Sequence, residues 1–236
     1  MLTLAIDSSQ DIGTLALGCD SQLVAEYHFR HKMDLLRRIM PITEELLADA
    51  GHSVRDIEGV IVSLGPGSFT GLRIGVTVAK SLAYTLGKPL VGIGTLDAIA
   101  RGVAPVATEL ICPMIFARTD EVYWSIFDAF GTARLADYQV STVHKALDDI
   151  QARAQAACFC GTGATKHAEQ IRHKFGNKAI VREYWSSFAR GAALLDLGNR
   201  RLHEGNVDDP FTLTPLYIRK PTPVVKLETG TLEKSK

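Results

Sequence analysis

The order of apolar strands and helices is the sequence feature that most restricts the fold, because the same order occurs in both halves of the chain. Three strand-like segments come first, and alternating helices and strands follow them. In the first half these segments are 2–6, 13–18, 22–29, 32–50, 60–64, 71–86, 89–93 and 95–104. In the second half they are 110–117, 122–127, 133–140, 143–154, 157–160, 164–175, 178–181 and 187–204.

This repeated β-β-β-α-β-α order predicts an α/β protein of two lobes, although no residue-level repeat accompanies it. We expect each lobe to hold a mixed sheet, and the corresponding loops of the two lobes to meet in a cleft. The predicted boundaries are 1–105 for the first lobe and 106–220 for the second. Residues 221–236 lose the apolar periodicity and gain charge, which predicts a mobile tail.

Composition excludes several classes of protein. The 236 residues include 26 Lys and Arg, 26 Asp and Glu, and 46% hydrophobic residues. This composition is typical of a globular chain, and a net charge of zero disfavours strong independent binding to nucleic acid. No uncharged run approaches the length of a membrane-spanning helix, about 18 residues. No signal-peptide pattern is evident either, so we expect a cytoplasmic protein without a membrane span.

An unusual glycine-rich segment, Gly65–Gly75, connects a strand to a helix. Its glycines permit positive φ and close backbone approach, and a hydroxyl side chain can cap the helix. The N–H groups at the start of such a helix suit an anion. However, the Lys-[Ser/Thr] pair of a Walker A loop is missing. The segment is therefore either a structural or interface turn or a phosphate-binding loop, with candidate residues Gly65, Gly67, Ser68, Thr70 and Arg73.

Asp7 ends the first strand and is followed by two serines, a pattern that could hold a metal-bound phosphate. An Asx turn explains the pattern equally well. The corresponding place in the second lobe, 116–122, contains no glycine, so a second phosphate hairpin is not expected there. An ATPase of this architecture would lack half of its phosphate clamp. The turn 161–164 is a further place where an adenosine could rest.

The two long helices of the first lobe carry candidate partner-binding residues. Gly71, Gly75, Ala79 and Ala83 form a stripe of small residues, which suits the close approach of another helix. Apolar residues of the preceding helix span roughly 160° of its circumference, more than the about 100° that one buried contact needs. They include Leu36, Met40 and Leu47. We predict that both sets bind another subunit; packing of the stripe on the chain's own sheet is the alternative.

Metal-binding and nucleophile motifs are absent from the sequence. Its seven histidines form no HExxH pattern, its four cysteines form no CxxC pair, and no GxSxG elbow occurs. We therefore predict no metal site, no cofactor and no catalytic residue.

The glycine-rich segment resembles that of the bacterial TsaB (YeaZ) family, which takes part in the biosynthesis of tRNA threonylcarbamoyladenosine. The supporting segments run from residue 4 to residue 219 and thus cover nearly the whole chain. They are Leu4–Ser9, Leu64–Gly75, Glu121–Tyr123, Gly161–Gly163 and Pro215–Arg219. The Gly-Pro-Gly-Ser-Phe-Thr-Gly motif is highly specific, and the others are supportive.

The resemblance implies a duplicated actin/Hsp70-like ATPase (ribonuclease H-like) fold with two βββαβα lobes. It also implies a non-catalytic partner of TsaD, the larger paralogue that transfers a threonylcarbamoyl group to adenosine 37 of ANN-decoding tRNAs. The first-lobe helices would bind TsaD, and TsaE, a small ATPase, would be the third member. The tRNA would be contacted only indirectly, and the same helices could form a homodimer in isolation.

Three segments depart from related patterns. TsaD carries metal-binding histidines at a place that here reads 91–98 and contains none. Segments 31–33 and 118–120 differ from the family's usual residues, so no function is carried onto them. Two other functions remain as alternatives: an autonomous ATP-dependent kinase or ATPase on the same fold, and a metal-dependent peptidase.

Overall fold

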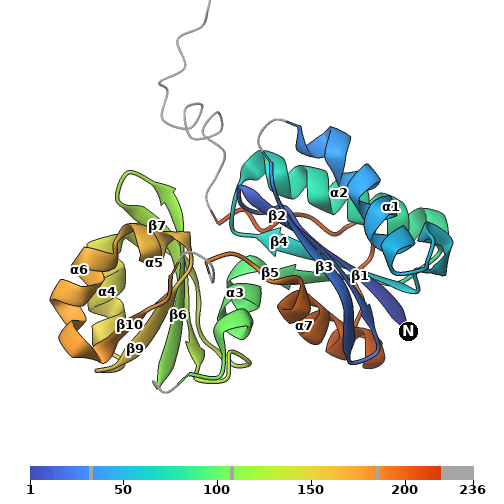
Figure 1. The fold of residues 1–236 in the computed structure, drawn as a ribbon. Coiled ribbons are helices and arrows are strands. Elements are labelled where there is room, and N and C mark those ends of the chain that lie inside the picture. Colours follow the sequence, from blue (N-terminus) through green and yellow to red (C-terminus); the bar gives the residue numbers. More distant parts are fainter. Residues whose placement is uncertain (32–33, 107–108, 184–186, 219–236) are drawn as a thin grey trace, which may run out of the picture.

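The computed structural model describes residues 1–31, 34–106, 109–183 and 187–218 of the chain (Figure 1). Its described strands form two five-stranded sheets. The predicted tail, 221–236, lies outside the described residues, as do Lys32 and Met33.

The first sheet has the strand order β3-β2-β1-β4-β5. Its strands are β1 (Leu2–Asp7), β2 (Ile12–Cys19), β3 (Gln22–Arg30), β4 (Gly59–Gly65) and β5 (Leu90–Gly94). β1, β2 and β3 are antiparallel neighbours, whereas β1, β4 and β5 run parallel. β1 and β4 are buried along their whole length, as expected for central strands covered on both faces.

The second sheet repeats this arrangement, because its order read from the other edge is β8-β7-β6-β9-β10. Its strands are β6 (Leu110–Arg118), β7 (Glu121–Asp128), β8 (Arg134–Thr142), β9 (Ala157–Cys160) and β10 (Ala179–Val181). Again the first three are antiparallel, and the last two join in parallel. The predicted duplicated α/β fold is therefore confirmed.

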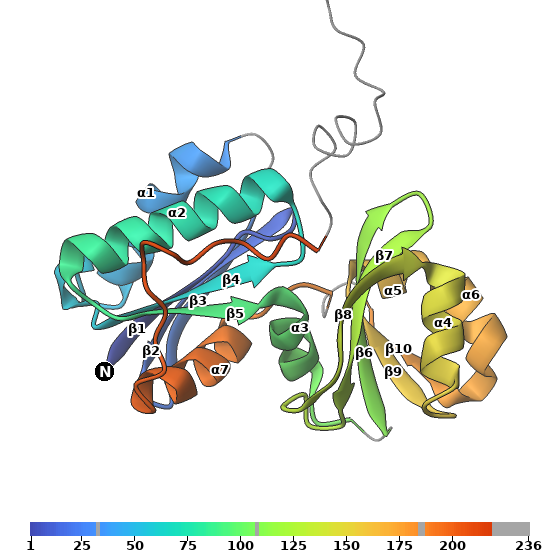
Figure 2. The same ribbon diagram turned by 180° about the vertical axis from the view of Figure 1, so that it is seen from behind.

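Helices cover both faces of the first sheet (Figures 1 and 2). Helices α1 (Leu35–Asp49) and α2 (Phe69–Leu86) lie on one face, and α7 (Gly191–His203) lies on the other. Helix α3 (Thr95–Val103) lies between the two sheets. Short 3-10 turns occur at Val54–Asp56 and Gly176–Lys178.

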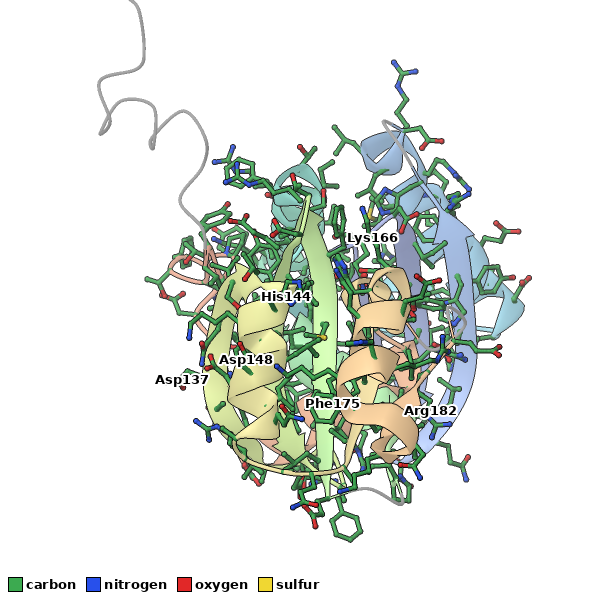
Figure 3. The ribbon with its side chains drawn as sticks, turned by 90° about the vertical axis from the view of Figure 1, so that its left-hand side faces the viewer. Asp137, His144, Asp148, Lys166, Phe175 and Arg182 are labelled. Atoms are coloured by element: carbon green, nitrogen blue, oxygen red, sulfur yellow. The ribbon has the colours of Figure 1, made fainter. Side chains whose placement is uncertain are left out.

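On the second lobe, α5 (Thr162–Lys166) contacts the first lobe through the hydrogen bond between Thr162 and Gln10, whereas α4 (Val143–Gln151) and α6 (Ala168–Phe175) lie on the side away from the first lobe. Figure 3 shows this side, where Phe175 packs edge-on against Phe159 at a ring distance of 5.0 Å. The prediction of one helix over 164–175 is wrong, because the chain leaves helical geometry at His167.

The end of the described chain returns to the first lobe. Helix α7 packs on β1, β2 and β5 although it follows the second sheet in sequence. Residues 206–218 then run beside α2 (Figure 2). The Asp208 N–H donates to Leu90 O and the Leu216 N–H donates to Leu64 O, both at 2.8 Å. The segment 191–218 is thus part of the first lobe's packing, beyond the predicted lobe boundary.

The apolar core consists of three clusters. One joins α1 and α2 to the first sheet, and another fills the second lobe around Trp124 and Phe159. The third lies between the sheets, where Ile99 of α3 packs with Phe127 of β7. This middle cluster fixes the two lobes relative to each other. No helix in the described part of the chain is long and apolar enough to cross a membrane.

Candidate functional site

The glycine-rich turn is held against the first hairpin, the loop between β1 and β2. A Cβ atom at Gly67 would lie 2.2 Å from Ser9 O, so only glycine fits this contact. The Ser68 N–H donates to the same carbonyl at 2.6 Å. The Ser68 hydroxyl then caps α2 by accepting a hydrogen bond from the Gly71 N–H at 3.2 Å. Ser68 is therefore the helix cap, and Thr70 is exposed.

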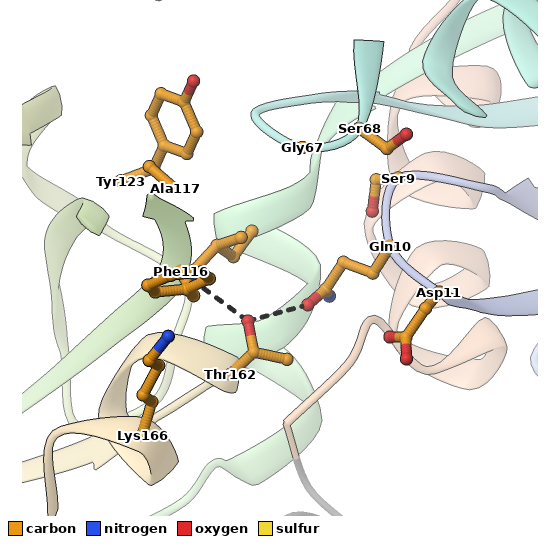
Figure 4. Close-up of a pocket in the computed structure, with 11 residues that line it drawn as sticks. Ser9, Gln10, Asp11, Gly67, Ser68, Phe116, Ala117, Tyr123, Thr162 and Lys166 are labelled. Carbon is orange, nitrogen blue, oxygen red and sulfur yellow. Dashed lines mark hydrogen bonds between the residues drawn. The ribbon is translucent and has the colours of Figure 1, made fainter. Parts of the chain in front are cut away.

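A cleft of ≈ 470 Å³ opens beside this turn, between the two lobes (Figure 4). The first-lobe wall comes from the first hairpin and the glycine-rich turn, and the second-lobe wall comes from β6, β7 and α5. The lining residues are Ser9, Gln10, Asp11, Gly67, Ser68, Ile115, Phe116, Ala117, Tyr123, Thr162 and Lys166. Equivalent loops of the two lobes thus face each other, as predicted from the duplicated order.

A hydrogen bond crosses the cleft. The Thr162 hydroxyl donates to Gln10 Oε1 at 3.2 Å, and the same hydroxyl accepts from the Phe116 N–H at 3.2 Å (Figure 4). Because Thr162 uses its single proton on Gln10 Oε1, the amide nitrogen of Gln10 points its donors elsewhere. The Ser9 hydroxyl and Gln10 Nε2 are buried and have no hydrogen-bond partner among the described residues.

The charged residues of the cleft are Lys166 and Asp11. Lys166 Nζ lies 3.4 Å from the centroid of the Phe116 ring, a cation–π contact. Among the described residues the ammonium group has no carboxylate partner. By contrast, Asp11 Oδ2 forms an ion pair with Arg30 Nη2 at 3.3 Å. The cleft therefore has a local excess of positive charge on its second-lobe wall.

Asp7 does not line the cleft, contrary to its selection as a phosphate-site candidate. Its side chain is only 1% exposed, and it accepts hydrogen bonds from the Ser63 hydroxyl and from the Ser9 N–H. Burial raises the pKa of this carboxyl, against the lowering effect of these hydrogen bonds. Asp7 is thus a buried residue at the end of β1.

The remaining loop candidates divide between the turn and the C-terminal segment. Gly65 has a φ of 109°, which favours glycine, and its N–H donates to Thr95 Oγ1 at 3.1 Å. The Arg73 guanidinium stacks 3.9 Å above the Phe69 ring, and its Nε donates to Tyr217 Oη at 3.2 Å. Of the predicted loop residues, only Gly67 and Ser68 line the cleft.

The predicted partner-binding residues also divide into two groups. Leu36 is 66% exposed, and Met40, one turn further along α1, is partly buried. The other five are buried in the chain's own core: Leu47, Gly71, Gly75, Ala79 and Ala83. Their selection as surface contacts is wrong, because a partner cannot reach them on the folded chain.

The small-residue stripe faces the sheet for a local reason. A Cβ atom at Gly71 would lie 2.1 Å from Ser8 O, and one at Gly75 would lie 2.1 Å from Ser8 Oγ. The stripe therefore lets α2 approach the end of β1. This confirms the alternative prediction for the stripe, which was packing on the chain's own sheet. On the outward side of the helix pair Leu36 of α1 is exposed, whereas Met40 of α1 and Ile74 and Val78 of α2 are partly buried and pack against the first-lobe core cluster.

The cleft residues that the sequence interpretation missed include Gln10, Phe116, Tyr123 and Lys166. The available signal was topological, since the duplicated order already brings the first hairpin opposite its counterpart in the second lobe. Within the described ranges no group of three or more His, Cys, Asp or Glu side chains could hold a metal ion.

Known proteins resemble this chain over most of its length. A family model described as "TsaD: tRNA N6-adenosine threonylcarbamoyltransferase" matches residues 32–221. A TsaB protein of Haemophilus influenzae is 36% identical over 78% of this chain and 79% of its own. TsaB of Bacillus subtilis is 29% identical over 93% of this chain and 94% of its own. Both are named as tRNA threonylcarbamoyladenosine biosynthesis proteins.

Two further comparisons define the extent of the likeness. A solved structure of YeaZ from Pseudomonas aeruginosa superposes with a TM-score of 0.74 at 22% identity, covering 92% of this chain and 99% of that one. It shows the same fold. A tRNA N6-adenosine threonylcarbamoyltransferase of Moorella thermoacetica is 46% identical, but over only 30% of this chain and 20% of its own. The full-length likeness is thus to the TsaB proteins.

Proposed function

The chain belongs to the TsaB/YeaZ family, which takes part in the biosynthesis of tRNA threonylcarbamoyladenosine, and from this premise we propose that it acts as a non-catalytic subunit by binding TsaD. In this proposal TsaD transfers the threonylcarbamoyl group to adenosine 37 of ANN-decoding tRNAs. TsaE is the third protein of the assembly, and this chain contacts the tRNA only indirectly.

The outward face of α1 and α2 supports a helical partner. Leu36 is a large apolar side chain at 66% exposure, and Met40 continues its face along α1. Ile74 and Val78 are spaced one turn apart on α2, which lies beside α1 (Figure 1). Apolar side chains spaced by four residues on two adjacent helices suit packing against helices of a partner. The exposed Leu36, together with the partly buried Met40, Ile74 and Val78 beside it, is the structural observation that carries the proposal.

The first-lobe end of the cleft supports a non-catalytic role. Asp7, the carboxylate at the position suited to a metal-bound phosphate, is closed off by Ser63 and the first hairpin. The Gln10–Thr162 hydrogen bond crosses the space between the lobes. A nucleotide hydrolysed there would require both contacts to open.

An autonomous ATPase or kinase is the second candidate, and the cleft itself favours it. Gly67 and Ser68 immediately precede the 18-residue helix α2 at the cleft, and Lys166 adds a positive charge on the facing wall. The two candidate functions differ in the rate of ATP hydrolysis that they predict for the isolated chain.

Reconstitution with purified proteins tests the proposal. Threonylcarbamoyladenosine in tRNA is measured by nucleoside mass spectrometry with TsaD, TsaE and the other pathway components, in the presence and absence of this chain. Heat-denatured chain is the matched control. Phosphate release from ATP by the chain alone is measured in parallel, and its complex with TsaD is measured by size-exclusion chromatography.

We expect modification only with the native chain, a stable complex with TsaD, and no ATP turnover above background by the isolated chain. Modification that proceeds equally without the chain would contradict the proposal. ATP turnover by the isolated chain, abolished by a change at Lys166, would favour the second candidate instead.

A further inference from the structure

We propose that a second cavity, within the first lobe, binds a free amino acid with an apolar side chain. This cavity lies between the turn that joins β2 to β3 and one face of α7. Helix α7 covers the sheet face opposite α1 and α2 (Figure 1), and no lining residue is shared with the cleft between the lobes. The inference therefore goes beyond the proposed function and does not depend on it.

The walls of the cavity come from two elements. The lining residues of α7 recur every three or four positions from Ala192 to His203, so they belong to one face of the helix. Residues 20–23, at the turn and the start of β3, form the other wall. The volume of ≈ 380 Å³ lies within the range of about 300–1,000 Å³ that small-molecule sites occupy.

A buried amide in the wall needs a hydrogen-bond donor. Asn199 is 8% exposed, and its Nδ2 donates to the backbone oxygen of Asp20 at 3.0 Å. That bond fixes the orientation of the amide, and Asn199 Oδ1 has no partner among the described residues. Buried polar atoms in proteins are nearly always paired, and a carbonyl oxygen can only accept. The ligand group that meets Asn199 is therefore a donor.

A carboxylate beside this amide favours an ammonium group as that donor. Asp20, which holds the Asn199 amide through its backbone oxygen, also lines the cavity. Its Oδ1 accepts from the Met1 ammonium at 2.7 Å, whereas its Oδ2 has no hydrogen-bond partner within the described ranges. An ammonium group has three donors, so it can serve both free oxygens, and its bond to the carboxylate is charge-assisted.

Arg200 supplies donors for a carboxylate on the ligand. Its Nη2 lies 3.3 Å from Asp196 Oδ2, which also accepts from Arg101 Nε at 2.6 Å. Two guanidinium groups thus share one carboxylate, and the three side chains together carry a net positive charge. In the part of the chain that the structure describes, Arg200 Nε and Nη1 have no hydrogen-bond partner. They can bind a carboxylate by charge-assisted hydrogen bonds.

Apolar side chains beside these groups account for the apolar part of the ligand. Leu195 lies one turn before Asn199 on α7, and Leu23 of β3 lines the cavity at 48% exposure. A ligand side chain that covers Leu23 removes apolar surface from water. The cavity thus places an apolar surface next to one group for an ammonium and one for a carboxylate. An α-amino acid carries all three parts on a single carbon atom.

Amide NMR spectra of the isotope-labelled full chain test the site with three probes. Leucine carries the ammonium, the carboxylate and the apolar chain. 3-Methylbutylamine lacks the carboxylate, and 4-methylpentanoate lacks the ammonium. Titration of each probe gives its affinity, and the resonances that shift show where it binds.

Three variants remove one feature of the site each. Arg200→Met removes the carboxylate donors, Asn199→Ala removes the buried acceptor, and Ala192→Trp fills the cavity. Arg172→Met, at an exposed arginine on α6 of the second lobe, is the matched control for Arg200→Met. Thermal melting establishes which variants are folded. Arg200 and Ala192 are exposed residues, so the test stands even if Asn199→Ala does not fold.

We expect leucine to shift the resonances of residues 20–23 and 192–203 and to bind at least about tenfold more tightly than either analogue. Arg200→Met should weaken leucine binding about tenfold or more, because it removes a hydrogen bond to a charged group. It should leave the affinity for 3-methylbutylamine unchanged, since that probe has no carboxylate. Asn199→Ala should weaken both of these probes, and Ala192→Trp should abolish binding of leucine.

Several results would overturn the proposal. One is the absence of leucine binding up to about 10 mM, and another is leucine binding that shifts only resonances outside residues 20–23 and 192–203. Equal affinity for leucine and for either analogue would mean that the ammonium or the carboxylate is not recognised. Equal effects of Arg200→Met and Arg172→Met on leucine binding would also contradict the site.

Discussion

Ser8 and Gly71 touch so closely that the contact admits no side chain at residue 71. A Cβ atom there would lie 2.1 Å from the Ser8 carbonyl oxygen, and the Ser8 hydroxyl donates to Gly71 O at 2.8 Å. This contact holds the first turn of α2 against the end of β1. The turn before α2 forms part of the cleft wall, so the geometry of the cleft depends on the same contact.

Gly71→Ala is therefore expected to lower the free energy of unfolding by about 1–3 kcal/mol, the usual cost of forcing an extra methyl group into a packed site. The added atom must push against backbone, which cannot rotate away as a flexible side chain would. Equilibrium unfolding in urea measures the change.

Gly102→Ala is the matched control, because Gly102 also lies in a helix. A Cβ atom there would be 3.4 Å from Arg190 Cγ, an ordinary contact. We expect this variant to stay within about 1 kcal/mol of the wild type or to be more stable, since Ala favours helix over Gly. Equal destabilisation by the two substitutions would contradict the role assigned to Ser8.

Glu26 provides a prediction about pH. Burial would raise the pKa of its carboxyl, but hydrogen bonds from His28, the Gly191 N–H and Arg190 outweigh this and lower it from 4.5 to about 2. The Gly191 N–H, at the start of α7, lies 2.7 Å from Glu26 Oε1. A lowered folded-state pKa contributes stability above the unfolded-state pKa, and that stability is lost as the pH falls toward 2.

Glu26→Gln removes this contribution. The free energy of unfolding of the wild type should exceed that of the variant near pH 7, and the difference should shrink between pH 5 and pH 2. Urea unfolding at a series of pH values measures it. A difference that does not change with pH would mean that the carboxylate charge is not what stabilises the start of α7.

The strand and helix order was the predictable part of the fold, because alternation and helical periodicity report which segments are strands and helices. The partner of a helix is less predictable. The apolar face of α7 has the same sequence pattern whichever sheet the helix covers. The sequence therefore did not predict that α7 packs on the first sheet. The interruption of the helix at His167 was also not predicted, because neither Pro nor Gly occupies that position.

The small-residue stripe shows a similar limit. The spacing of Gly71 and Gly75 indicates close approach, but it does not say whether the neighbour is the chain's own sheet or another molecule. The structure supplies the neighbour, Ser8. In the cleft, Gln10 and Thr162 are 152 positions apart. Their meeting depends on the angle between the lobes, which the middle core cluster sets and a sequence pattern does not encode.

Leu36→Glu tests the outward face of α1. A charge on a 66% exposed residue should leave the stability of the isolated chain within about 0.5 kcal/mol, because no core contact is lost. Binding to TsaD should weaken at least about tenfold, since a carboxylate would be desolvated in an apolar interface. Calorimetric titration with TsaD measures the affinity.

Leu135→Glu serves as its control, because Leu135 is 48% exposed on β8 of the second lobe. It should not change the affinity for TsaD. If both leucine variants bind TsaD as tightly as the wild type, the partner surface lies elsewhere on the chain.

Asp7→Asn separates a structural from a catalytic role of the buried carboxyl. Burial raises the folded-state pKa of Asp7 above 3.8. The free energy of unfolding of the wild type therefore falls as the pH rises above 3.8, because the carboxyl ionises more readily in the unfolded chain than in the folded one. The asparagine keeps an oxygen that can accept from Ser63 and Ser9 without that cost. We therefore expect the variant to be at least as stable as the wild type near pH 7, with the advantage narrowing on acidification.

The same variant should support tRNA modification at the wild-type rate, because a non-catalytic subunit needs no carboxylate at this position. Nucleoside mass spectrometry of the reconstituted reaction measures the rate. Asp120→Asn, an exposed carboxylate on the corresponding hairpin of the second lobe, is the control and should change neither stability nor modification. Loss of modification in a stable Asp7→Asn protein, with Asp120→Asn fully active, would instead make Asp7 a functional residue of an ATP-dependent enzyme.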